Sequence, residues 1–69
     1  FRLFLELSKE DNIAIYFFDM RGTILHQELI KGVDAYVNDF HFDNLSAGMY
    51  FMQANLGRET KIFRVVITR

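Results

Sequence analysis

The side chains of this chain that could do chemistry are two histidines and the acids beside one of them. His26 and His41 lie fifteen positions apart, and neither has further ligands at the compact spacing that a zinc site needs. Asp39 and Asp43 flank His41, which is suggestive of general acid–base chemistry, but no nucleophile accompanies them. Charged neighbours of this kind are common on exposed strands. We therefore expect surface side chains here, with no catalytic or metal-binding role.

Other motifs of catalysis and ligand binding are also missing from the sequence. Ser46 lies in Leu-Ser-Ala-Gly, which is not the Gly-x-Ser-x-Gly sequence of a nucleophile elbow. The glycines form no phosphate-binding run, and no alternating Asp-x-Asp pattern predicts a calcium loop. The aromatic residues could form a sugar-stacking platform, but in so short a chain we expect most of them in the core. The sequence predicts a protein that is not an enzyme and holds no cofactor.

Length and charge restrict the class of protein further. The 69 residues suffice for one small domain, and 51% of them are hydrophobic, which is too many for a disordered chain. The net charge of −1 argues against a nucleic-acid partner, and no apolar run approaches the roughly 20 residues of a membrane helix. With no cysteine, no disulfide is available. Because the chain opens without a leader sequence, we interpret residues 1–69 as one domain cut from a longer precursor.

The charges are unevenly distributed along the chain. Residues 45–69 carry the bases Arg58, Lys61, Arg64 and Arg69 and the single acid Glu59. This pattern is typical of a solvated strand face, and it also fits a basic edge that a partner recognises.

The hydrophobic pattern has a period of two, which is typical of strands. It predicts strands at 1–7, 13–18, 23–28, 35–42, 49–54 and 59–68, with a polar turn at 9–12 and a loop at 29–34. The continuous apolar run at 13–18 predicts a strand that is covered on both faces or paired at the centre of the sheet. The fold class is therefore all-β, a small antiparallel immunoglobulin-like β-sandwich of about six to seven strands. We expect its buried residues to include Leu3, Leu5, Ile13, Ile15, Phe17, Leu45, Tyr50, Met52 and Val65.

The last third of the chain carries the most specific pattern. It reads Leu-Ser-Ala-Gly-Met-Tyr at 45–50, then a strand, a turn at Gly57, and a basic and β-branched strand to the end. This pattern resembles the C-terminal sorting domain of the type IX (Por) secretion system of Bacteroidota. The Asp-Met-Arg-Gly turn at 19–22 resembles the family's mid-domain turn. The Asn-Pro-aromatic segment that opens the family is absent, and Arg64 stands where lysine is more usual.

The resemblance implies a non-catalytic signal that directs a secreted cargo through the outer-membrane translocon. A sortase then removes the domain, the cargo domain lies upstream in the same chain, and the product passes the periplasm to reach the cell surface or the medium. The candidate recognition residues are those shared with the family's pattern and the basic tail: Gly48, Tyr50, Gly57, Lys61, Arg64, Val65, Val66 and Arg69. The alternative function is an immunoglobulin-like accessory module of a secreted protein, either a spacer or a ligand binder.

We also expect the isolated domain to self-associate. The chain has no proline to protect strand edges, and both terminal strands carry apolar residues. A strand-swapped homodimer, or pairing of free edges, is the expected form.

Overall fold

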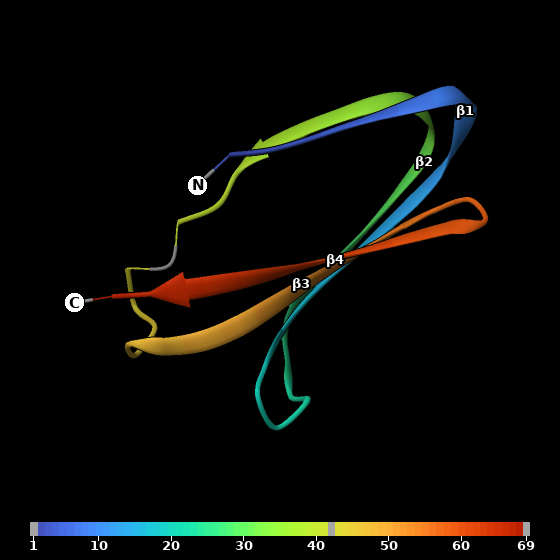
Figure 1. The fold of residues 1–69 in the computed structure, drawn as a ribbon. Helices are drawn as coiled ribbons and strands as arrows, with labels where there is room; N and C mark the ends of the chain where they lie inside the picture. The colour runs from blue at the N-terminus through green and yellow to red at the C-terminus, as the bar shows by residue number, and fades with distance from the viewer. Residues whose placement is uncertain (1, 42, 69) are drawn as a thin grey trace.

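The structure, a computed structural model, describes residues 2–41 and 43–68 (Figure 1). Four strands form one antiparallel sheet in the order β2-β1-β3-β4. Their bounds are β1 (Arg2–Asp19), β2 (Ile24–Asp39), β3 (Gly48–Leu56) and β4 (Glu59–Ile67). The described residues contain no helix, so the prediction of an all-β antiparallel fold is confirmed.

The predicted count of six to seven strands is wrong, because the polar segment 9–12 and the segment 29–34 bend their strands without ending them. β1 continues through residues 9–12 and β2 through 29–34. The register of β1 on β2 shifts between Glu6 and Asp11 and again before Ile13, as in a β-bulge, and Gly32 of β2 has a φ of +65°. A bulge or a left-handed glycine turns a strand sharply while the pairing resumes on either side. Each predicted pair of short strands is therefore one long, bent strand.

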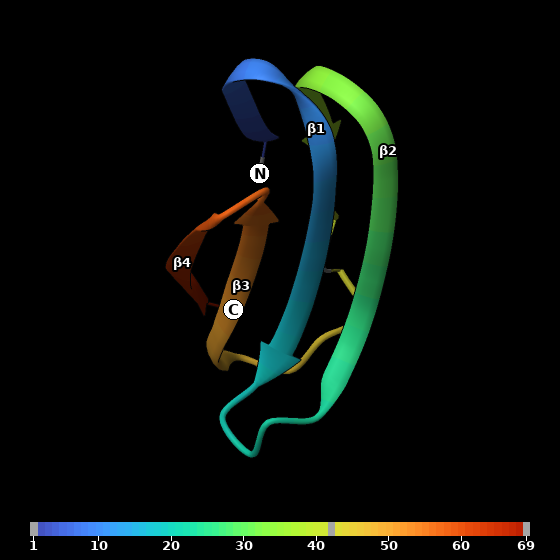
Figure 2. The same cartoon turned by 90° about the vertical axis from the view of Figure 1, so that its right-hand side faces the viewer.

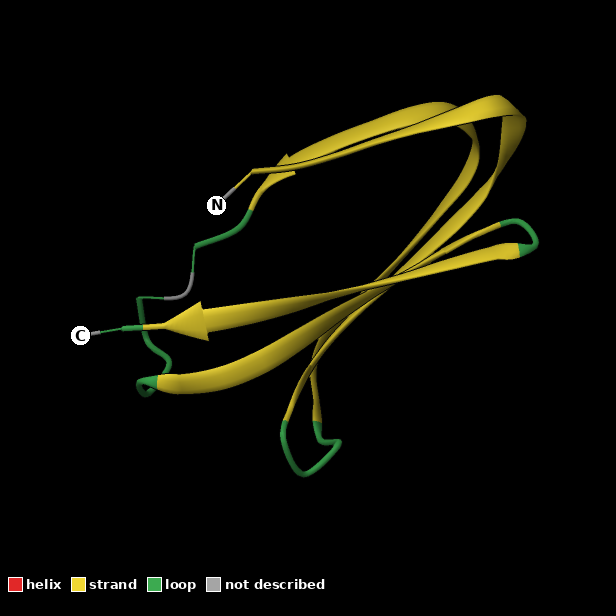
Figure 3. Cartoon of the chain, viewed as in Figure 1, coloured by secondary structure: helices red, strands yellow, loops and turns green. Residues whose placement is uncertain are grey.

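The bends fold the single sheet over on itself. The first part of β1 and the last part of β2 form an arm that arches back over the rest of the sheet (Figures 1 and 2). Leu3 and Leu5 of this arm share one buried cluster with Ile13, Ile15 and Met52. The core thus lies between two parts of one sheet, instead of between the two separate sheets of the predicted immunoglobulin-like sandwich. Figure 3 shows how much of the chain these strands occupy.

The buried core agrees closely with the period-two pattern. Its members are Leu3, Leu5, Ile13, Ile15, Phe17, Phe40, Tyr50, Met52, Ala54 and Leu56. Leu45 and Val65, which we predicted as buried, are only partly buried and pack against the edge of this core.

Of the two predictions for the run at 13–18, the central place in the sheet is confirmed, since this part of β1 pairs with β2 on one side and β3 on the other, whereas cover on both faces is not found. Ala14, Tyr16 and Phe18 lie half-buried on the outer face of the sheet. There the ring of Phe18 stacks on that of Phe51, with 5.7 Å between ring centroids. The apolar residues between the buried ones are thus partly covered by neighbouring rings on the outer face, and not by a second layer.

The turn at 19–22 forms as the sequence predicts. One carboxylate oxygen of Asp19 accepts hydrogen bonds from the backbone N–H groups of Arg21, at 2.9 Å, and Thr23, at 3.0 Å. The N–H of Gly22 donates to the carbonyl of Asp19 at 3.0 Å. This turn joins β1 to β2 as a hairpin.

A polar cluster within β2 connects the two sides of its bend. The Tyr36 hydroxyl donates to Glu28 Oε2 at 2.6 Å, and Asn38 Nδ2 donates to Glu28 Oε1 at 3.3 Å. His26 Nε2 lies 2.8 Å from the same Oε1 atom. Because these residues come from opposite sides of Gly32, their hydrogen bonds stabilise the bend that places the arm over the core.

Replacing Tyr36 with phenylalanine is expected to destabilise the fold by about 1–2 kcal/mol at neutral pH, because Glu28 loses a short hydrogen bond. Burial and then the bond to Glu28 raise the pKa of Tyr36 to about 12, so folding favours the neutral phenol. Its contribution is complete below the unfolded pKa of about 10 and is lost as the pH rises toward 12. The measurement is urea unfolding of both proteins from pH 7 to 12. A stability difference that stays constant over this range would contradict the assignment.

Candidate functional site

The eight candidate recognition residues do not gather on one surface. Tyr50 is buried, its ring stacks on Phe17 with 5.5 Å between centroids, and its hydroxyl donates to the carbonyl of Ser46 at 2.7 Å. Tyr50 therefore fixes the turn before β3 to the core. Gly48 is the first residue of β3 and pairs with Ile67 of β4.

Gly57 joins β3 to β4 and contacts the bend of β1. Its φ is +64°, a conformation that favours glycine, and its N–H donates to the carbonyl of Asn12 at 3.4 Å. A Cβ atom built on Gly57 would clash with the carboxylate of Asp11. The conformation and this close approach give Gly57 a structural role in seating the hairpin on β1.

The other candidates lie on β4, where they alternate between two faces. Val65 is paired with Tyr50 and faces the core side, and it is partly buried. Lys61, Arg64 and Val66 are exposed, and Arg69 lies outside the described residues. Arg64 pairs with Phe51 on the outer face of the sheet, and within the described part of the chain it has no ion-pair partner. The exposed candidates on this strand can therefore meet a partner without any unfolding.

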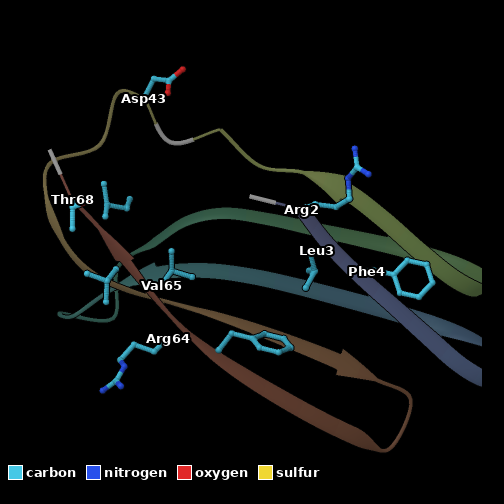
Figure 4. Close-up of a pocket in the computed structure, with 10 residues that line it drawn as sticks. Arg2, Leu3, Phe4, Asp43, Arg64, Val65 and Thr68 are labelled. Carbon is cyan, nitrogen blue, oxygen red and sulfur yellow. The ribbon is translucent and has the colours of Figure 1, made fainter.

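A groove opens between β4 and the arm, and we call it the β1–β4 groove (Figure 4). It is lined by Arg2, Leu3 and Phe4 of β1, by Asp43, and by residues 63–68, and its volume is about 730 Å³. Leu3 and Val65 point into the space between the strands, while Arg64 points away from it. The walls and floor of the groove are thus mainly apolar, with charged groups at its rims.

The charges around the groove are of two kinds. Arg2 is held by Asp39 through hydrogen bonds of 2.8 Å and 3.2 Å. This contact lowers the pKa of the Asp39 carboxyl and raises that of the guanidinium. Arg2 is therefore already neutralised by a neighbour on the arm, whereas Arg64 has no ion-pair partner among residues 2–41 and 43–68.

The side chains considered for catalysis are dispersed. His26 belongs to the polar cluster of β2 and meets the ring of Phe40 edge-on, with 5.9 Å between centroids. His41 is exposed on the segment after β2. Over residues 2–41 and 43–68 no group of three or more histidines and acids could hold a metal ion. In the same part of the chain there is no helix of the length and apolarity that a membrane span requires.

Sequence reasoning missed the other side of the groove. Phe63 and Ile67 follow from the alternation of the last strand, but nothing in the local pattern brings Arg2, Leu3 and Phe4 next to them. These two segments are about sixty positions apart. The signal that could have found them is the apolar pattern on both terminal strands, which indicates faces that need a common cover.

Comparison with known proteins places the chain in a family. Residues 2–68 match a family model described as the secretion system C-terminal sorting domain. No curated protein and no solved structure matches the chain.

Proposed function

Because the chain belongs to the family of secretion system C-terminal sorting domains, we propose that it is recognised by the outer-membrane translocon through its last strand. The family is that of type IX secretion, so the protein to which this domain belongs is secreted or exposed at the cell surface. In our proposal the domain itself catalyses nothing. The precursor crosses the periplasm of a member of the Bacteroidota, and a sortase removes the domain from the upstream cargo.

One observation carries the proposal: β4 combines positive charge with an edge that no described strand covers. β4 pairs only with β3, and the lysine and arginine of this strand, Lys61 and Arg64, are both exposed. An uncovered strand offers backbone groups for pairing, while charges set the orientation and the rate of association. Two other family-like positions have structural roles instead: Tyr50 fixes the turn before β3, and Gly57 seats the hairpin of β3 and β4 on β1.

The test is secretion of a reporter that carries residues 1–69 at its C-terminus, expressed in a bacterium with a type IX system. Lys61→Ala with Arg64→Ala is expected to reduce the reporter at the cell surface by about tenfold and to retain it in the periplasm. Circular dichroism of the purified variant should show an intact fold, because both side chains are exposed.

The matched control is Arg21→Ala with Lys31→Ala, which removes the same charge from exposed positions outside β4. This control is expected to be displayed normally. Normal display of the Lys61 and Arg64 double variant would refute recognition through β4, and display without any domain would favour the accessory spacer. Mass spectrometry of the displayed reporter checks the sortase step, since the mature reporter should lack residues 1–69.

Self-association of the isolated domain remains a prediction. The free edge of β4 permits it, but the arginine there disfavours pairing with an identical edge. We therefore expect dimers only at high protein concentration, measured by light scattering.

A further inference from the structure

We infer that the β1–β4 groove accepts an extended segment of a partner protein, which adds to the free edge of β4 with apolar residues on its inward face and an acidic residue beside Arg64. This inference rests on the proposed function, because it names the chemistry of the partner that the last strand meets.

The first support is the uncovered backbone of β4. This strand has β3 on one side, and in the described part of the chain its other edge has no strand neighbour. Along a strand, backbone N–H and C=O groups point in turn to the two edges, so a free edge is a template for another strand. The groove runs beside residues 63–68 of this edge.

The second support is that the apolar floor of the β1–β4 groove is incompletely covered. Phe63 faces the same side as Met52, its partner on β3, yet Phe63 is 37% exposed while Met52 is fully buried. The arm does not pair with β4, and its side chains leave Phe63 incompletely covered. An added strand would place every second side chain beside Phe63, Val65 and Ile67 on the same face. Those side chains must be apolar, because the surface they cover is apolar.

The third support is the charge beside this edge. The remaining side chains of an added strand point to the outer face, where Arg64 lies between the exposed Ile62 and Val66 and has no ion pair in the described chain. Opposite charges on neighbouring strands stabilise the pair, and like charges directly opposite one another destabilise it. An acidic residue is therefore favoured at the outward position beside Arg64.

Two further features decide which part of β4 accepts the added strand and exclude a second copy of the chain as the favoured partner. Lys61 lies on the inward face of the first half of β4, and an inward charge on an edge strand opposes further pairing. The accepting part thus begins near Phe63. A second copy pairing through its own β4, centred on this region, would bring two Arg64 side chains together. The edge therefore suits an acidic partner better than an identical one.

The experiment uses the 69-residue chain and a capped nine-residue peptide that alternates glutamate with valine. Binding is followed by ¹H–¹⁵N NMR and amide hydrogen exchange at a concentration where light scattering gives the monomer mass. We expect edge amides between Phe63 and Ile67 to exchange at least tenfold more slowly with peptide present. A peptide with lysine in place of glutamate should bind about tenfold more weakly. Arg64→Glu should reverse this preference, whereas Arg58→Glu, in the turn before β4, should leave it unchanged.

Three results would overturn the inference: no binding of the glutamate peptide, protection confined to β2, or protection of the same β4 amides by a second copy without peptide. Failure of the peptide together with impaired secretion of the Lys61 and Arg64 double variant would leave the proposed function standing. Peptide binding with normal secretion of that variant would support the groove as a strand acceptor and overturn its role in sorting.

Discussion

Replacing Phe17 with alanine is expected to leave most of the chain unfolded at 37 °C. Phe17 is 1% exposed and lies between the two parts of the folded sheet, where its ring stacks on Tyr50. Removing a buried phenylalanine ring costs about 3–5 kcal/mol. A domain of this size has a total stability of about 3–10 kcal/mol, so the loss takes a large share of it or all of it. Urea unfolding followed by circular dichroism measures the change.

The adjacent residue provides the matched control for this variant. Phe18 lies on the outer face, half-buried and stacked on Phe51. Phe18→Ala removes the same ring from the neighbouring position, and we expect a loss of only about 1–2 kcal/mol. Equal losses at the two positions would show that both faces of β1 are covered, contrary to the structure.

Replacing Gly57 with alanine is expected to destabilise the fold by about 2–3 kcal/mol. An alanine at positive φ costs about 1 kcal/mol or more, and the new methyl group would also meet the Asp11 carboxylate. The hairpin of β3 and β4 would then lift from the bend of β1, where Gly57 now donates to Asn12. Thermal unfolding should show the loss as a decrease of roughly 10 °C in Tm.

The backbone strain at Gly57 and the contact with Asp11 can be separated by a double-mutant cycle with Asp11→Ala. Removing the carboxylate relieves the contact with the new methyl group but leaves the backbone strain. In the Asp11→Ala background, Gly57→Ala should therefore cost about half of what it costs in the unchanged chain. If the two changes are simply additive, the clash contributes nothing, and strain at Gly57 is the whole effect.

The sorting signal and the groove depend on the hairpin in different ways. The core residue Phe17 and the hairpin residue Gly57 determine whether β4 is held beside the arm at all. In our proposal Arg64 acts only after the fold has formed. A secretion defect from Phe17→Ala or Gly57→Ala would therefore report on stability, and only the exposed variants of β4 test recognition.

The sequence by itself determined most of the buried residues and the family to which the chain belongs. A period of two is a property of a strand's own geometry, so it identifies the inward side chains of Leu3, Ile15 and Met52 wherever the strand runs. The Asp19 turn is equally local, because its hydrogen bonds join residues at most four positions apart. The family pattern in the last third is local as well, and the match over residues 2–68 confirms it.

Tertiary structure decided how many strands those residues form and what lies beside β4. A polar segment such as 9–12 can end a strand or bend it, and the choice depends on whether pairing with a distant strand resumes beyond it. Here the bends at 9–12 and at Gly32 are held by contacts between distant residues, among them Glu28 with Tyr36 and Gly57 with Asn12. The same bends carry Arg2, Leu3 and Phe4 to the groove. Local sequence patterns carry no information on such contacts. The groove therefore forms only when the sheet folds over itself.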